Sequence, residues 1–78
     1  MDYLKTARAH LDVALANIED DPAREEEFAA GGIAVTLWDL GEDRACEIFA
    51  EDGFPTDFNR EGIRFALGVL DRYEAKRA

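Results

Sequence analysis

The stretch Glu27–Gly41, EFAAGGIAVTLWDLG, is the least polar part of this chain and contains two adjacent glycines. Residues 33–38 include β-branched and aromatic types that favour strands, so a strand that follows a Gly-Gly turn is one interpretation. The sequence contains no second strand-like run, and a lone strand could pair only with another chain. A helix needs no such partner, although each mid-helix glycine costs about 1 kcal/mol relative to alanine. The sequence therefore favours a helix here and leaves an intermolecular strand at 33–38 as the alternative.

The rest of the chain shows helical periodicity, with apolar residues recurring at spacings of three and four. Asp21 and Pro22 are typical of a helix start, and Gly41 of a helix end. Thr56 or Asp57 is expected to cap the last helix. These signals predict an all-α fold, a small bundle of about four helices in a single domain over 1–78. The expected ranges are approximately 2–19, 22–40, 42–52 and 57–76.

The second predicted helix is apolar on nearly every side, so we expect it to be central in the bundle. Its glycines, like Gly62 in the last helix, are expected where another segment of backbone comes close. Trp38 is assigned to the core by default. If only one face of this helix is buried within the chain, however, the opposite face becomes an apolar interface formed by Gly31, Val35 and Trp38.

Acidic residues outnumber basic ones by 18 to 9, which gives a net charge of −9. This charge opposes direct binding to nucleic acid and to anionic membranes, and it favours a basic protein partner. Only two of the nine basic residues are lysines, so adaptation to salt or to high solubility is an alternative reason for the acidity. The chain shows no membrane-spanning run and no signal peptide, and its only cysteine is Cys46. A cytoplasmic location is therefore expected.

Two groups of carboxylates are candidates for binding that partner. Asp43, Glu47 and Glu51 are spaced four apart, so on one helix they would form an acidic line that could imitate a phosphate backbone. A second group surrounds the first loop, where part of it is explained by the helix dipole. The predicted acidic face comprises Asp39, Glu42, Asp43, Glu47, Glu51, Glu25, Glu26 and Glu27.

Enzymatic chemistry is not expected. His10 and Cys46 are far apart in sequence, and neither has the spacing of metal ligands around it. Cys46 is expected to be a small buried hydrophobe. The pairs Arg60/Arg64 and Arg72/Lys76 are expected to form local ion pairs or to compensate the helix end. We therefore predict no catalytic residue, no metal and no cofactor.

The function predicted first is a small inhibitor that occupies a basic, nucleic-acid-binding surface of a target protein. Anti-CRISPR and anti-restriction proteins of phages or mobile elements act as DNA mimics in this general way, and the analogy is one of size and charge. The alternative is a homodimerisation or assembly module, antitoxin-like or an accessory subunit, that uses the apolar second helix. A helix-turn-helix around Gly41 is disfavoured because EDRACEIFAED has five acids and one arginine.

Overall fold

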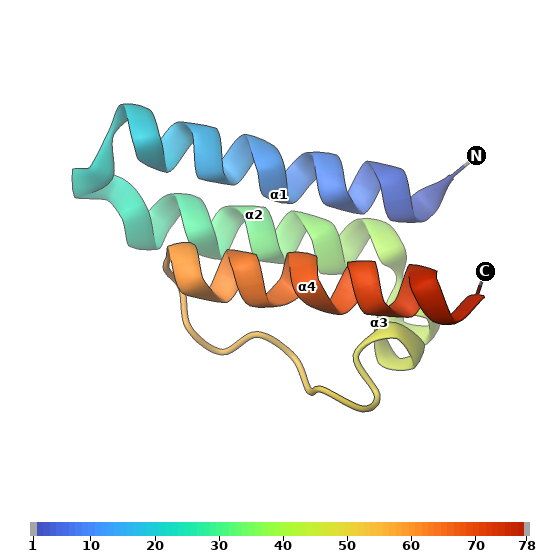
Figure 1. Cartoon of the computed structure of the whole chain (residues 1–78). Helices are drawn as coiled ribbons and strands as arrows, with labels where there is room; N and C mark the ends of the chain where they lie inside the picture. The colour runs from blue at the N-terminus through green and yellow to red at the C-terminus, as the bar shows by residue number, and fades with distance from the viewer. Residues whose placement is uncertain (1, 78) are drawn as a thin grey trace.

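The computed structural model describes residues 2–77, and this part of the chain is an all-α bundle. Its helices are α1 (Tyr3–Asp20), α2 (Glu25–Leu40), α3 (Glu42–Ile48) and α4 (Arg60–Arg77). Three long helices lie side by side, with α1 antiparallel to α2 and α4, and the short α3 lies beneath the end of α4 (Figure 1). The predicted fold class and number of helices are confirmed, and residues 33–38 are helical.

The connection between α1 and α2 differs from the predicted helix start at Pro22. Asp21 makes no capping hydrogen bond with its side chain, and Pro22–Arg24 form a single turn of 3-10 helix instead of the start of α2. The regular helix begins at Glu25, so Glu25, Glu26 and Glu27 do lie in its first turn, as expected. Proline favours the first position of a helix, but three residues of tight 3-10 winding are needed here to reverse the chain between α1 and α2.

Helix α2 packs against α1, α3 and α4, so it does hold the central position that its composition predicts. Gly32 allows the closest approach. A Cβ atom added to it would lie 2.5 Å from the Cβ of Ala14 on α1. The helix ends at Gly41, which has a φ of +86° and donates its backbone N–H to the carbonyl oxygen of Leu37 at 3.1 Å. That conformation suits glycine and confirms the predicted helix end.

Two predicted helix boundaries are wrong, the end of the third helix and the start of the fourth. Helix α3 ends at Ile48 and not at 52, because the buried Phe49 is followed by a turn that leads to Gly53. Helix α4 starts at Arg60 and not at 57. Asn59 is its effective cap, since its side-chain oxygen accepts a hydrogen bond from the N–H of Gly62 at 2.9 Å. A loop of extended and turn conformation therefore fills 49–59.

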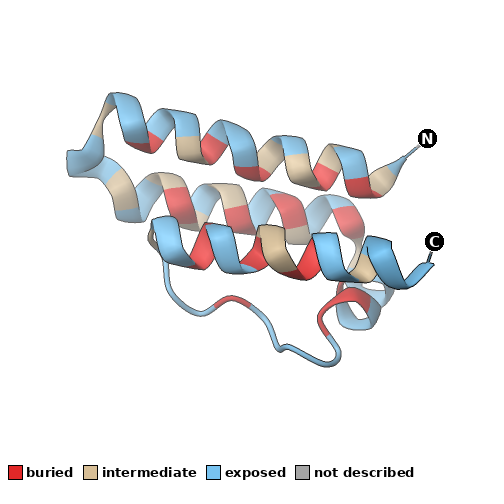
Figure 2. Cartoon of the chain, viewed as in Figure 1, coloured by how far each residue is buried: buried red, intermediate tan, exposed pale blue. Residues whose placement is uncertain are grey.

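The core lies where the three long helices face one another and extends to the inner side of α3 (Figure 2). On α2 the buried side chains are Ala29, Ile33, Thr36 and Leu40, and the hydroxyl of Thr36 donates to the carbonyl oxygen of Gly32 at 2.8 Å. Small residues on α1 and α2 keep these two helices close, while large aliphatic and aromatic side chains fill the space toward α3 and α4. The largest fully buried apolar side chains are Phe49, Leu4, Leu11, Ile18, Ile63, Leu70 and Val69.

Candidate protein-binding surfaces

One side of α2 is open to solvent, although its residues are as apolar as those of the buried side. Trp38 is 89% exposed and Val35 48% exposed, and the neighbouring Val13 of α1 is 59% exposed. The default assignment of Trp38 to the core is therefore wrong. Gly31, Val35 and Trp38 follow one another at spacings of four and three, which places them on one stripe of the helix. We call this stripe, with Ala34 and Val13, the α2 face.

A groove of about 270 Å³ lies on the α2 face between α1 and α2. It exists because neither Gly31 nor Gly32 carries a side chain, while Val13 and Phe28 form its walls. An added Cβ at Gly31 would meet nothing within 4 Å, so this glycine points outward and not toward a neighbouring helix. His10 lies at the rim, with its Nε2 atom 3.1 Å from a carboxylate oxygen of Asp39. The α2 face thus combines a hollow with a projecting indole two helical turns away.

The acidic line predicted on the third helix is not continuous. Asp43 and Glu47 lie on α3, but Glu51 lies beyond its end and forms an ion pair with Lys76 of α4. Asp39 lies within hydrogen-bond distance of His10, and Glu47 contacts Tyr73 of α4. A hydrogen bond to the Glu47 carboxylate, together with burial, raises the pKa of Tyr73 to about 12. Of the carboxylates predicted here, Glu42, Asp43 and Glu47 make no ion pair within residues 2–77.

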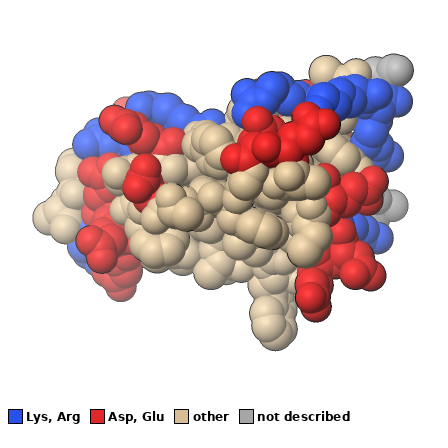
Figure 3. Space-filling model, turned by 90° about the horizontal axis from the view of Figure 1, so that it is seen from below, with Lys and Arg blue, Asp and Glu red and all other residues tan. Residues whose placement is uncertain are grey.

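The second acidic group is also partly neutralised. Glu25 pairs with Arg60 of α4, and Glu27 pairs with Arg24 at 2.7 Å. Glu26 forms no ion pair in the described part of the chain, and it lies near the acidic end of α1. Seen from below, acidic side chains lie in separate groups at the left, the upper middle and the right of the view, with uncharged surface between them (Figure 3). The structure therefore separates the predicted acidic face into two groups.

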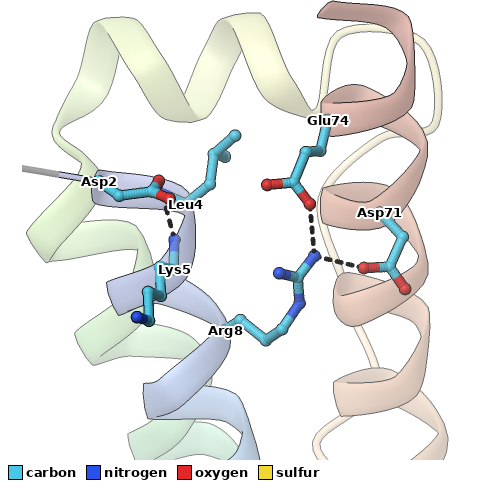
Figure 4. A network of polar contacts seen from close by, with 6 residues as sticks. All are labelled: Asp2, Leu4, Lys5, Arg8, Asp71 and Glu74. Carbon is cyan, nitrogen blue, oxygen red and sulfur yellow. Dashed lines mark hydrogen bonds and ion pairs between the residues drawn. The ribbon is translucent and has the colours of Figure 1, made fainter. Parts of the chain in front are cut away.

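Basic residues of α4 pair with other elements, in contrast to the local pairs predicted within the helix. Besides the contacts of Arg60 and Lys76, Arg72 lies 3.6 Å from Asp52 in the loop. One pair has its basic residue on another helix: Arg8 of α1 forms ion pairs with Asp71 and Glu74 of α4 (Figure 4). Each of these exposed pairs is expected to add little stability, because solvent screens it.

Glu25 has an additional role at the start of α4. Its carboxylate accepts the backbone N–H of Arg60 at 2.8 Å and the guanidinium of the same residue at 3.2 Å. The first N–H groups of a helix have no partner within the helix, so Glu25 caps α4 from a neighbouring element. The backbone hydrogen bond and then the guanidinium lower the pKa of Glu25 below its ordinary value.

Replacing Glu25 by glutamine is expected to lower the free energy of unfolding at neutral pH. The variant should also lose less stability than the parent chain when the pH is lowered. A carboxyl whose pKa is lowered by folding stabilises the protein above its unfolded-state pKa, and this contribution is lost as the pH falls through its folded-state pKa. Urea unfolding from neutral pH down to below the ordinary glutamate pKa of about 4.3 tests this. Glu26→Gln removes the same charge from the next position and is the control. Equal midpoints for the two variants at neutral pH would contradict the capping role.

The remaining candidates for chemistry do not come together. Cys46 is exposed, so its predicted burial is wrong: the buried residues of α3 are Ala45 and Ile48. Residues 2–77 contain no group of three or more His, Cys, Asp or Glu side chains placed to hold a metal ion. Within the same residues, no helix is long and apolar enough to cross a membrane.

The sequence shows a mildly apolar second side of α1 that includes Val13, and Val13 is exposed. Sequence reasoning missed the exposure of three phenylalanines. Phe54, Phe58 and Phe65 are exposed around the loop and the start of α4, at 45%, 47% and 38%. Phe58 and Phe65 are predicted to lie on the buried stripe of the last helix. Taking Asn59 as the cap would have placed Phe58 before the helix.

Comparison with protein-family models, with curated proteins and with solved structures gives no match for this chain. A function can therefore be inferred only from the surfaces described above.

Proposed function

We propose that this protein is a helical assembly module that pairs with a second copy of itself through the α2 face. The observation that carries the proposal is the 89% exposure of Trp38. A tryptophan side chain can bury about 150–250 Å², and covering a large apolar side chain fully is worth about 1.5–3 kcal/mol. Tryptophan is also enriched among the residues that dominate binding at protein interfaces.

The shape of the α2 face favours a second copy as its partner. Two-fold dimers use the same patch on both chains, so a patch must be complementary to itself. Trp38 projects seven residues beyond Gly31, about 10 Å along the helix axis. If two α2 helices cross antiparallel with the two-fold axis near residues 34 and 35, Trp38 of each copy lies opposite the Gly31 groove of the other.

The charge of the chain sets the expected salt dependence of this pairing. Each copy has a net charge of −9, and Glu27, Asp39 and Glu42 lie around the α2 face. Two copies therefore repel one another at low ionic strength, and salt screens the repulsion. We expect the dimer to become tighter as salt is added. Binding to a basic protein would show the opposite dependence, because salt screens an attraction.

Replacing Trp38 by alanine is expected to weaken the dimer by about two to three orders of magnitude. Each copy loses one anchor of about 2 kcal/mol or more, while the folded monomer loses almost no buried surface. Sedimentation velocity at micromolar to millimolar protein, at low and high salt, measures the association. Circular dichroism checks that helix content is unchanged.

Phe58→Ala is the matched control, since it removes an exposed aromatic ring outside the α2 face. It is expected to dimerise as the parent chain does. A parent chain that stays monomeric at millimolar concentration in high salt would contradict the homodimer. So would a Trp38→Ala variant that associates as strongly as the parent.

A second candidate function, the acidic inhibitor of a basic target protein, is supported by the corner between α1 and α2. Glu19, Asp20, Asp21 and Glu26 make no ion pair within residues 2–77, so their charge is available to a basic nucleic-acid-binding surface. Capture from the native host at low salt, with release at high salt, would favour this function. Reversing the charges at this corner should then abolish capture and leave the homodimer intact.

A further inference from the structure

A second groove, of about 400 Å³, lies on a different side of the molecule from the α2 face. It is formed by the loop 49–59 and the first turns of α4, along the lower edge of Figure 1. Phe54, Pro55 and Phe65 supply its apolar lining, and Asp52, Asp57 and Glu61 its charged lining. Figure 3 views the molecule from this side and shows uncharged surface that borders several groups of acidic side chains. We call this hollow the loop groove.

Packing contacts and one hydrogen bond hold the walls of the loop groove in place. The ring of Phe54 stacks on the buried Phe49, with 5.3 Å between centroids and 24° between planes. Pro55 is buried, and Asn59 caps α4 immediately after the loop. Gly62 lets the backbone of Asp57 lie directly against α4. The groove is therefore preformed, and a ligand would not have to order it.

The charges lining the loop groove are all negative. Asp52 is partly balanced by Arg72 at 3.6 Å, but Asp57 and Glu61 make no ion pair within residues 2–77. No lysine or arginine lines the groove. The faces of aromatic rings also attract cations. The phenylalanine rings and the carboxylates of the loop groove therefore favour the same kind of ligand. Such a ligand has a positively charged group on an aliphatic chain.

We propose that the loop groove binds an arginine side chain carried on an extended segment of a partner protein. The aliphatic part of arginine would pack against Phe54 and Phe65, and its guanidinium would meet Asp57 and Glu61. Arginine fits better than lysine because its planar guanidinium both stacks on rings and pairs with carboxylates through several N–H groups. This site lies apart from the α2 face, so it does not depend on the proposed dimer.

The test is a ¹H–¹⁵N NMR titration of the full chain with the peptide acetyl-Ala-Arg-Ala-Arg-Ala-amide. We expect shifts concentrated on the backbone amides of 52–65, and none there with the matching peptide that has glutamine in place of arginine. The Trp38→Ala variant should bind the peptide as the parent does, which separates this proposal from the dimer.

Two variants identify the groups that bind the peptide. Asp57→Asn with Glu61→Gln is expected to weaken binding about fivefold, as the loss of exposed charge pairs implies. Glu42→Gln with Asp43→Asn removes two charges elsewhere and should change nothing. Phe65→Leu keeps an apolar side chain but removes the ring, and should weaken binding about two- to fivefold. Equal shifts at residues 19–21, or equal affinities for the two charge variants, would overturn the proposal.

Discussion

Replacing Gly62 by alanine is expected to destabilise the protein by about 3 kcal/mol, a large fraction of the stability of a domain this small. An added Cβ would overlap the carbonyl oxygen of Asp57 and lie 2.9 Å from its carbonyl carbon. Both atoms are backbone, and the loop that carries them is fixed by the buried Pro55 and by the Asn59 cap. Relief would require the loop to separate from α4. Urea unfolding followed by circular dichroism measures the change.

Gly68→Ala provides the matched control for this substitution. Gly68 lies on the same helix, and its added Cβ would approach only the guanidinium of Arg72, at 3.3 Å. The end of a flexible side chain can move, so helix propensity should dominate and stability should rise by up to about 1 kcal/mol. If the two variants unfold at similar urea concentrations, the close packing of Asp57 against α4 is not a feature of the folded protein.

The two adjacent glycines of α2 are expected to respond in opposite directions. Gly31→Ala should stabilise the monomer by about 0.5–1 kcal/mol, because the added methyl group meets nothing within 4 Å and alanine favours helix. Gly32→Ala should destabilise it by about 2 kcal/mol, since its Cβ would lie 2.5 Å from that of Ala14. Thermal and urea unfolding of dilute protein measure both changes.

A double mutant tests the cause of the second effect. Ala14→Gly removes the atom that the new methyl group would meet, so adding it to Gly32→Ala should recover part of the loss despite the cost of a new glycine in α1. The coupling energy of this cycle is expected to be favourable by 1 kcal/mol or more, as for residues in direct contact. No coupling between the two sites would show that α1 and α2 do not meet there.

Much of the fold follows from local signals in the sequence. The periodicity of α1, the acidic first turn of α2 and the glycine at position 41 each specify structure through contacts within a few residues. Helix ends were less predictable where several residues could serve as caps. Thr56, Asp57 and Asn59 all have suitable side chains, and the packing of Gly62 against Asp57 places the start of α4 after Asn59.

The candidate surfaces were less predictable because they depend on which neighbours are present. Periodicity cannot orient a helix that is apolar on every side, so Trp38 was assigned by default to the core, although the stripe with Gly31 and Val35 was identified as a candidate interface. The prediction of a continuous acidic line on the third helix fails for a related reason. Spacing shows that Glu51 would follow Glu47 on a continuing helix, but it does not show that the helix ends or that Lys76 lies within reach.

The exposure of Trp38 also determines what its fluorescence can report. It is the only tryptophan in the chain, and its indole is in water in the folded monomer, as it is in the unfolded chain. Its emission wavelength is therefore a poor measure of unfolding. A shift of the Trp38 emission maximum to shorter wavelength instead indicates that another surface covers the α2 face. The intrinsic fluorescence of Trp38 therefore reports association and is nearly independent of the folding equilibrium.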